Sequence, residues 1–200
     1  PIGTSDDISF RGTFDGNSHL ISNLYVNRPT TSGVGLFGYV YNATILNLGI
    51  TGNSSLMGKE RAGGLVGRCY INTEGHMISG CFSDADVTAS GDNTGGLIGM
   101  FRSTKAFSVT NCYSTGNISG KNYTGGIVGR LDDNTDFSIS NCYSAGNIAS
   151  TGNDSRTGGI LTKASSVKAT VSNCYYINGD ENNANTAIKK TIEEMKNAEF

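Results

Sequence analysis

Gly63-Gly64-Leu65-Val66-Gly67 decides the fold of this chain, because the same block returns at a regular interval. It recurs as Gly95-Gly96-Leu97-Ile98-Gly99 and as Gly125-Gly126-Ile127-Val128-Gly129. A shortened copy reads Gly158-Gly159-Ile160-Leu161, and an earlier variant reads Gly35-Leu36-Phe37-Gly38. A short block that recurs at a fixed period is the signature of a repeat architecture.

A second block follows each glycine block at a similar distance. Asn111-Cys112-Tyr113-Ser114 matches Asn141-Cys142-Tyr143-Ser144, and Asn173-Cys174-Tyr175 matches both. Gly80-Cys81-Phe82-Ser83 is the same block with Gly in place of Asn, and the four cysteines are 31, 30 and 32 residues apart. A third block, Gly116-Asn117-Ile118-Ser119, returns as Gly146-Asn147-Ile148-Ala149. Each unit of about 30 residues therefore holds three short β-like pieces separated by turn residues.

Composition favours a thin, folded β structure. The chain has 200 residues with 28 Gly, about twice the usual share, only 2 Pro, and a net charge of −2. Short strands at a constant period and without helical periodicity predict an all-β, right-handed parallel β-solenoid of about six coils with ~30-residue repeats. The balanced charge argues against nucleic-acid binding, and no run of apolar residues is long enough to span a membrane.

Two columns emerge when the repeats are aligned, with Ile21-Ser22-Asn23-Leu24 and Ile45-Leu46-Asn47-Leu48 placed beside Ile139-Ser140-Asn141-Cys142. Asn and Gly share a tolerance of left-handed backbone, so we expect a corner in that column and a ladder of stacked Asn side chains. The next column accepts Leu or Cys, which predicts buried free thiols and no disulfides; Cys69 lies outside it and is expected to be exposed. The first column holds Asn23, Asn47, Gly80, Asn111, Asn141 and Asn173, and the second holds Leu24, Leu48, Cys81, Cys112, Cys142 and Cys174.

An aromatic column is the candidate binding surface. Because neighbours in a strand face opposite ways, aromatic residues that follow the buried column should face outward. A stripe of rings can stack on sugars or on a partner protein, or it can act as a surface ladder that supports the stacking of strands. Gly49 interrupts the series, which otherwise consists of Tyr25, Phe82, Tyr113, Tyr143 and Tyr175.

Other motifs are interpreted as structural. The G-x-G-x-x-G match at Gly33–Gly38 precedes a β-type run, where a dinucleotide site needs a helix. The acidic stretch Asp132–Asp136 lacks the Gly and the distal Glu of an EF-hand loop, which favours a solvated turn. No cluster of Cys or His has zinc-site spacing, so we expect no metal and no cofactor.

A polysaccharide lyase or glycoside hydrolase is the main alternative, since solenoid enzymes exist. It would need acids from different coils to converge, with loop residues such as Asp92, Asp132 or Asp136 as the candidates. The repeated positions hold no Asp, Glu, His or Arg column, and His19 and His76 occupy unrelated positions of the repeat. No catalytic residue is therefore nominated.

After Tyr176 the repeat stops, which divides the chain into a solenoid (1–178) and a polar loop with a short helix (179–200). Thr191 and Glu194 form a capping-box pattern, and Ile192, Met195 and Ala198 would give the helix an apolar face. The helix could cover the last coil or begin a connection to another domain. Because the chain begins at Pro1 and ends within this helical pattern, we interpret it as a piece of a longer protein.

The in-phase pairing of Gly-Gly-Leu-Val-Gly with Asn-Cys-Tyr-Ser-Thr-Gly-Asn-Ile-Ser-Gly resembles the GLUG repeat family of bacterial proteins. The opening stretch from Phe10 to Leu24 is similar to the segment that often leads into such repeats, and the likeness extends to about Tyr176. It departs in the last coil, where Leu161-Thr162 replaces Val-Gly, and in the first, which lacks Cys. The resemblance implies secreted or cell-surface proteins, some of them immunoglobulin-A-specific metallopeptidases whose repeats lie outside the catalytic zinc domain.

The expected function is a non-catalytic extracellular module of a bacterial secreted or surface protein. It would serve adhesion, ligand presentation or spacing, as a monomer, with a glycan or a host or matrix protein as partner. Alternatives are a polysaccharide-acting solenoid enzyme and the non-catalytic region of an exported peptidase. No H-E-x-x-H is present in this chain, and the resemblance carries over no catalytic residues.

Overall fold

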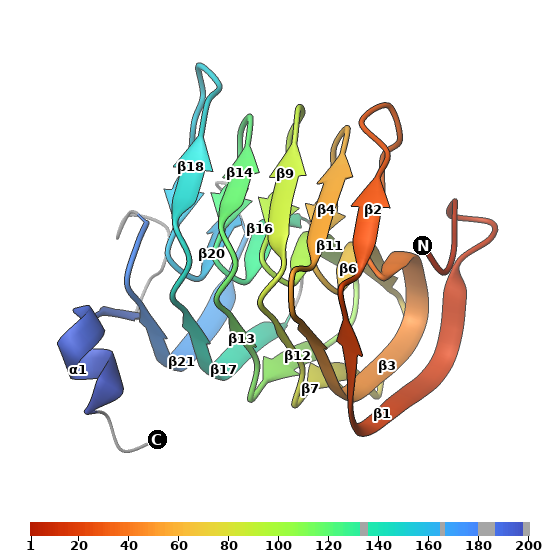
Figure 1. The fold of residues 1–200 in the computed structure, drawn as a ribbon. Coiled ribbons are helices and arrows are strands. Elements are labelled where there is room, and N and C mark those ends of the chain that lie inside the picture. The colour runs from red at the N-terminus through yellow and green to blue at the C-terminus, as the bar shows by residue number, and fades with distance from the viewer. Residues whose placement is uncertain (133–135, 165–166, 180–186, 198–200) are drawn as a thin grey trace.

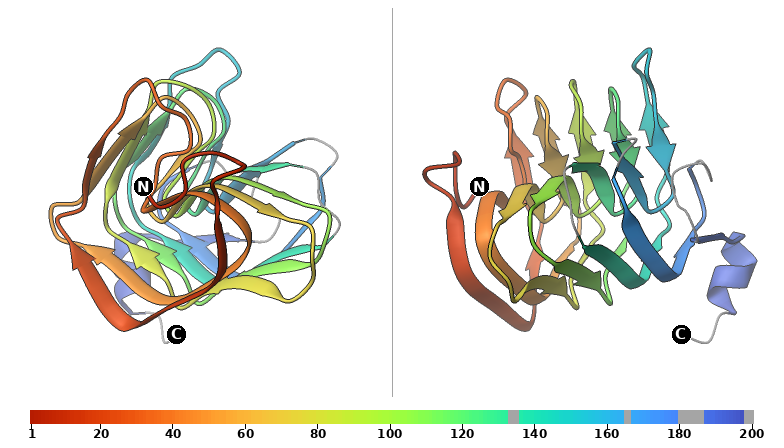
Figure 2. Two further views of the ribbon diagram at one scale, coloured as in Figure 1. Left: turned by 90° about the vertical axis from the view of Figure 1, so that its right-hand side faces the viewer. Right: turned by 180° about the vertical axis from the view of Figure 1, so that it is seen from behind.

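The computed structural model describes residues 1–132, 136–164, 167–179 and 187–197, and it confirms a nearly all-β parallel solenoid (Figure 1). One turn runs through β4 (Ser55–Gly58), β5 (Ala62–Gly63), β6 (Val66–Ile71), β7 (His76–Ser79) and β8 (Phe82–Ser83) before the chain enters the next coil at β9 (Asp86–Ala89). Viewed along the axis, the coils superpose around one narrow interior (Figure 2). Every strand pairing in the described residues joins parallel strands.

Five short strands stand side by side along one face of the solenoid, in the upper part of Figure 1, and mark about five turns. A second, four-stranded sheet follows at the corner where each Gly-Gly pair begins. The first sheet contains β2 (Tyr25–Asn27), β4 (Ser55–Gly58), β9 (Asp86–Ala89), β14 (Ile118–Gly120) and β18 (Ile148–Ser150), and the second contains β5 (Ala62–Gly63), β10 (Thr94–Gly95), β15 (Thr124–Gly125) and β19 (Thr157–Gly158).

The remaining strands of the described chain form one bent sheet that covers the other sides of each coil. Its long strand β3 (Phe37–Thr51) pairs with β6 along its first part and with β7 and β8 along its second. The other members are β1 (Phe10–Ser22), β6 (Val66–Ile71), β7 (His76–Ser79), β8 (Phe82–Ser83), β11 (Ile98–Ser103), β12 (Phe107–Thr110), β13 (Tyr113–Ser114), β16 (Val128–Asp132), β17 (Phe137–Ser144), β20 (Leu161–Lys163), β21 (Ala169–Tyr176) and β22 (Ile188–Lys189).

The predicted left-handed corner is confirmed at Asn47, Gly80, Asn111, Asn141 and Asn173, whose φ angles lie between 48° and 64°. The expected ladder is also present where Asn meets Asn. The Asn141 Nδ2 donates to Asn111 Oδ1 at 3.2 Å, and Asn173 Nδ2 donates to Asn141 Oδ1 at 3.2 Å. At Gly80 the ladder is interrupted because glycine has no side-chain amide. Each coil thus turns at the same place because only Asn and Gly accept that backbone readily.

The first coil does not follow the predicted register. Ile21 pairs with Ile50 and Ser22 with Thr51, so Asn23 lies against Gly52 and not against Asn47. Asn23 is still left-handed, with φ of 58°, but it makes a different corner. The alignment was wrong because Asn23 and Asn47 are only 24 residues apart, less than one coil.

The corner beside Asn47 is instead made by a bulge between Asp15 and His19. Asp15 Oδ1 accepts a hydrogen bond from Asn47 Nδ2 at 3.1 Å, and it also accepts one from the Asn17 backbone N–H at 2.8 Å. The bonds from Asn17 and then Asn47 lower the pKa of the Asp15 carboxyl. In the first coil, the Asp15 carboxylate therefore accepts the hydrogen bond from Asn47 that another Asn would accept in the ladder.

The glycine blocks allow the coils to approach closely at the corner between the small sheet and the bent sheet. A Cβ at Gly96 would lie 2.1 Å from Ser114 Oγ and 2.2 Å from the Gly126 carbonyl oxygen. Gly126 stands in the same relation to Ser144 and to the Gly159 carbonyl of the next coil. Contacts this short leave no room for a side chain, so the repeated Gly is required by packing between coils.

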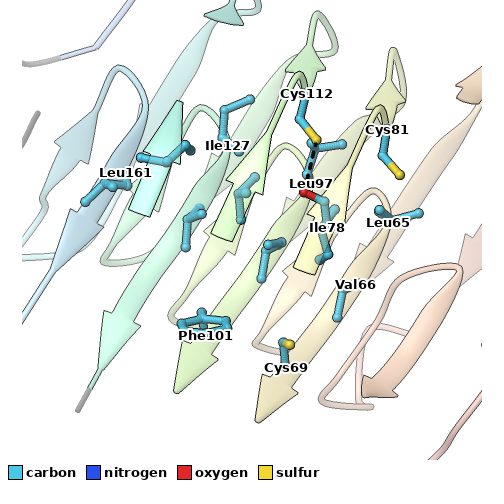
Figure 3. Close-up of a cluster of buried hydrophobic side chains, with 14 of the residues drawn as sticks. Leu65, Val66, Cys69, Ile78, Cys81, Leu97, Phe101, Cys112, Ile127 and Leu161 are labelled. Atoms are coloured by element: carbon cyan, nitrogen blue, oxygen red, sulfur yellow. Dashed lines mark hydrogen bonds between the residues drawn. The ribbon is translucent and has the colours of Figure 1, made fainter. Parts of the chain in front are cut away.

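The core is one continuous cluster of buried apolar side chains that includes the cysteine column; Figure 3 shows part of it, with Cys81 and Cys112. Leu48 and the four cysteines of that column are at most 2% exposed, and all five cysteines of the chain are free thiols. Each column thiol donates to the carbonyl of the residue two positions earlier, as Cys112 does to Thr110 at 3.1 Å. Leu24, which the shifted first coil removes from the column, packs against the core but is only partly buried.

Cys69 is buried, and the prediction that it is exposed was wrong. It lies on β6 with Val40 and Phe101 as its partners in the adjacent coils. Burial raises the pKa of its thiol well above the usual range. Because side chains alternate along a strand, Cys69 points inward while Arg68 and Tyr70 point outward. This two-residue period is not visible in the repeated blocks from which the exposure of Cys69 was predicted.

The predicted C-terminal helix is present as α1 (Ile192–Lys196), and its capping box joins Thr191 and Glu194 as expected. It does not cover the last coil, because none of its residues is buried and Ile192 is 58% exposed. That edge is covered instead by β22, whose Ile188 and Lys189 pair with Tyr175 and Tyr176. Ala198 and residues 180–183 of the polar loop lie outside the described residues.

Replacing Gly96 by Ala should lower the free energy of unfolding by about 2–3 kcal/mol, because the new methyl group meets a backbone carbonyl that cannot move without shifting a coil. Thr88→Ala, an exposed change on β9, is the matched control and should stay within about 0.5 kcal/mol of the parent. Urea unfolding followed by circular dichroism measures both. Equal stability of the two variants would contradict the close stacking of the coils.

Asn47 allows the left-handed corner to be tested separately from the ladder. Asn47→Gly and Asn47→Ala both remove the hydrogen bond to Asp15, but only Ala places a Cβ in the strained region. We expect the Ala variant to be less stable than the Gly variant by about 1 kcal/mol in the same unfolding measurement. An Ala variant that is the more stable of the two would show that the corner does not select Asn and Gly for their backbone.

Candidate functional site

Four of the five predicted aromatic residues form one outward column on the bent sheet. Phe82, Tyr113, Tyr143 and Tyr175 are in register across β8, β13, β17 and β21. The ring centroids of Phe82 and Tyr113 are 4.6 Å apart and those of Tyr113 and Tyr143 are 4.8 Å apart, each pair with an interplanar angle of 5°. The spacing equals that of paired strands, so the backbone dictates how the rings stack.

Tyr25 is not a member of this column. It lies on β2, pairs with Ser55 in the five-stranded sheet, and is 71% exposed. The position it was expected to fill belongs to Leu20, which pairs with Gly49. Gly49 in turn pairs with Phe82, whose ring occupies the space where a Cβ of Gly49 would be. The error has the same origin as that of Asn23, namely the shifted register of the first coil.

Stacking changes what the tyrosines can offer to a ligand. Both faces of Tyr113 are covered, one by Phe82 and the other by Tyr143. A sugar ring cannot stack on a face that another ring already covers, so the column presents ring edges and phenol groups. The ladder function considered for these residues is thus built into the structure, with each stacked pair adding about 0.5–1.5 kcal/mol beyond its buried area.

A groove of about 780 Å³ runs beside the aromatic column and across three successive coils. Its walls contain the amides of the Asn ladder together with the tyrosine edges, and Ile188 of β22 and Lys190 add to the lining. The volume is within the usual range for ligand sites. The lining residues are Asn111, Cys112, Tyr113, Asn141, Cys142, Tyr143, Asn173, Tyr175, Ile188 and Lys190.

The C-terminal segment contributes Ile188 and Lys190 to the lining of the groove, and Lys190 is fixed by two contacts. The Lys190 backbone N–H donates to the Tyr176 carbonyl at 2.8 Å, and its Nζ lies 3.7 Å from Glu194 Oε1. The sequence predicted the Asn column as a corner and a hydrogen-bonded ladder, not as part of a binding site, and it placed neither Ile188 nor Lys190 in any site. The two-residue spacing of Asn and Tyr in each repeat indicates a shared face, whereas nothing in the repeat predicts the return of the tail.

A second, smaller cavity of about 350 Å³ contains the acidic residues Glu74 and Asp136 together with His76. Glu74 is paired with Lys105 at 3.7 Å, and His76 Nε2 lies 3.0 Å from Thr73 Oγ1. Phe107 and Phe137 form part of its wall. This cavity brings one of the three acids considered for an enzyme beside two further titratable groups.

The other two acids considered for catalysis, Asp92 and Asp132, lie outside this cavity, and each contacts another polar side chain. Asp92 Oδ1 accepts from Asn122 Nδ2 at 3.0 Å, at the turn between β9 and β10. Asp132 is paired with Arg130 at 3.0 Å at the end of β16. Neither lines the cavity that contains Asp136. The three candidate acids therefore do not converge on one site.

The remaining motifs have structural surroundings. The G-x-G-x-x-G segment leads into strand β3, where a dinucleotide site would have a helix, which confirms its structural interpretation. Residues 133–135 of the acidic stretch lie outside the described residues. Within the described residues, no three His, Cys, Asp or Glu side chains are grouped so that they could hold a metal ion. No helix in the described part of the chain has the length and apolar character needed to cross a membrane.

Comparison with known proteins supports the repeat and the fold. Residues 120–149 match the family model of the GLUG motif, so the resemblance drawn from the in-phase blocks is confirmed. Over 105 residues, half of this chain, the sequence is 39% identical to halomucin from Haloquadratum walsbyi, of which the aligned part is 1%. The chain is therefore a parallel β-solenoid that carries the GLUG motif.

A solved structure has the same fold over nearly the whole chain. It is a protein from Bacteroides ovatus, provisionally named an immunoglobulin A1 protease, with a TM-score of 0.66 and 23% identity. The superposition covers 98% of this chain and 74% of that one. At this level of identity the likeness concerns the fold alone.

The tyrosine column should make folding stability pH-dependent in the alkaline range. Burial, and then the charge of Asp84, raises the pKa of Tyr113, and burial, followed by Tyr113, raises the pKa of Tyr143. Unfolded tyrosines lose their protons near pH ~10 while the folded ones retain them, so the free energy of unfolding should fall as pH rises through this range.

Urea unfolding measured from neutral to alkaline pH tests this dependence. The double variant Tyr113→Phe/Tyr143→Phe keeps the stack, removes both phenols, and should show a shallower loss of stability than the parent. Thr88→Ala, far from the column, should retain the parental slope. An unchanged slope in the double variant would contradict the raised pKa values of the two tyrosines.

Proposed function

We propose that this chain is a non-catalytic extracellular module of a secreted or cell-surface protein, acting as a rigid spacer that presents a ligand-binding face. The groove beside the aromatic column carries the proposal. Among the described residues, its lining offers phenols, amides, two buried thiols and one lysine, but no carboxylate. Phenols and amides can hold a ligand by hydrogen bonds, and this lining lacks the pair of carboxylates that glycoside hydrolysis uses.

The architecture supports the spacer part of the proposal. Successive coils are joined by backbone hydrogen bonds on several sides, and buried Leu, Ile, Val and Phe fill the interior from β3 to β21. A rod of this kind resists bending because each coil packs on both neighbours. Surface groups along it therefore keep fixed distances, which is useful for holding a ligand or for separating two domains.

The names of the similar proteins support an extracellular location. Halomucin is named as a mucin, and the Bacteroides ovatus protein is named for an antibody substrate, immunoglobulin A1. The shared part is 1% of halomucin, and the Bacteroides ovatus chain extends beyond the region that superposes. We therefore propose that this module belongs to exported proteins of several kinds and does not itself carry their activity.

A solenoid hydrolase remains the second candidate, and the cavity with Glu74, His76 and Asp136 is the observation that favours it. Two carboxylates and an imidazole can provide acid–base chemistry when they converge on one bond. Against this, Glu74 is engaged by Lys105 and His76 by Thr73. The non-catalytic proposal therefore explains more of the structure.

Incubating the purified chain with linear polysaccharides and with immunoglobulin A should leave both intact, because the candidate acids do not converge. Reducing-end assays and gel electrophoresis measure the two reactions, and the Asp136→Asn variant is the control for contaminating activity. New ends or fragments produced by the parent and lost in Asp136→Asn would overturn the proposal in favour of the hydrolase. Antibodies against the chain should also label intact cells or culture supernatant of the source organism.

A further inference from the structure

The groove between the Asn ladder and the tyrosine edges runs along the solenoid axis. Its lining residues come from equivalent positions on three coils, at 111–113, at 141–143, and at 173 and 175. Chemically equivalent groups therefore recur at the strand spacing of ~4.8 Å, and the first and third are about 10 Å apart. A ligand that repeats its own polar groups at a similar interval can satisfy each coil in the same way.

The Asn ladder leaves hydrogen-bonding capacity facing this groove. Asn141 gives one N–H to Asn111 and accepts one bond from Asn173, so its amide retains a second donor and a second lone pair. Asn111 Nδ2 has no side-chain oxygen below it in the ladder, because Gly80 occupies the preceding position of the column. All three asparagines are exposed. The groove wall is thus a row of paired donors and acceptors.

An extended peptide does not match this row. Peptides that join a sheet lie alongside its edge strands, whereas this groove crosses the strands and offers no free edge along its length. Peptide residues also advance by about 3.3 Å, which is out of phase with groups ~4.8 Å apart. A β-linked pyranose in an extended polysaccharide advances by nearly one coil spacing and offers hydroxyl groups at each step.

The charge of the groove selects among polysaccharides. Lys190 is the one ionic side chain among the described lining residues, and it is paired with Glu194 at 3.7 Å. A uronate or sulfate group placed here would lose water without gaining a counter-charge of its own. Hydroxyl and acetamido groups, by contrast, exchange bonds with water for bonds with Asn amides and phenols at little cost.

We propose that this groove binds a linear, uncharged β-linked polysaccharide lengthwise, about three sugar units at a time, one unit per coil. The contacts are hydrogen bonds from the Asn amides and the tyrosine edges, without stacking of sugar on the ring faces of Tyr113. The inference rests on the proposed function, because it identifies the ligand class of the same face. It predicts selectivity for chain length and for the absence of charge.

Isothermal titration calorimetry of the full chain tests the proposal with uncharged gluco-, xylo-, manno- and chito-oligosaccharides from monosaccharide to hexasaccharide. For at least one series, affinity should rise with each added sugar up to about the trisaccharide, one sugar for each of the three coils, and then level off. Polyuronates and heparin should bind more weakly than that series. A Tyr113→Phe variant, which keeps the stack, should bind about two- to tenfold more weakly, the worth of one neutral hydrogen bond.

Tyr25→Phe is the matched control, because it removes a phenol from an exposed tyrosine on β2, outside the groove, and should bind like the parent. Thermal unfolding verifies that both variants are folded. Any of four results overturns the proposal: no binding by any uncharged series, affinity independent of length, tighter binding of charged chains, or equal affinity of Tyr113→Phe and Tyr25→Phe. Cleavage of the sugars would instead overturn the non-catalytic function, so the two failures are distinguishable.

Discussion

Parallel hydrogen bonding between successive coils is the constraint from which the other features of this protein follow. Each coil must trace nearly the same path as the coil below it, so a residue is tolerated only if its equivalents in the neighbouring coils fit against it. This is why the corner beside the small sheet is made of Gly, where a Cβ at Gly96 would meet the Gly126 carbonyl oxygen at 2.2 Å. It is also why the left-handed corner alternates only between Asn and Gly.

The same constraint explains the pairing of Asn with Cys. The left-handed corner turns the chain so that the next side chain faces the interior, and in four coils that side chain is a thiol. Cys112 is small enough for a narrow core and donates to the Thr110 carbonyl just before the corner. A Leu at this position, as at Leu48, fills the interior without that bond. The column is therefore an apolar filler in which each thiol also makes a weak local hydrogen bond.

On the outer surface, stacking both creates the candidate site and limits its chemistry. In-register rings at strand spacing cover one another's faces, so Tyr113 offers its edge and hydroxyl instead of an aromatic platform. The asparagines beside it are likewise partly used in the ladder, yet each amide has more hydrogen-bonding groups than the ladder consumes. A repetitive backbone thus produces a repetitive set of polar groups along the axis, and this periodicity is what distinguishes the groove from an ordinary surface depression.

The sequence by itself determined the solenoid, the left-handed Asn and Gly corner, the buried cysteine column and the capped terminal helix, because each depends on local chemistry repeated at a constant period. Tertiary structure alone decided the register of the first coil. The similar short blocks at Asn23 and Asn47 are only 24 residues apart, less than one coil, so Asn23 and Tyr25 do not belong to the columns in which the alignment placed them. It also determined that the tyrosine rings stack on one another's faces and that Ile188 and Lys190 line the groove. These depend on distances between coils and on the path of the tail, which no local pattern specifies.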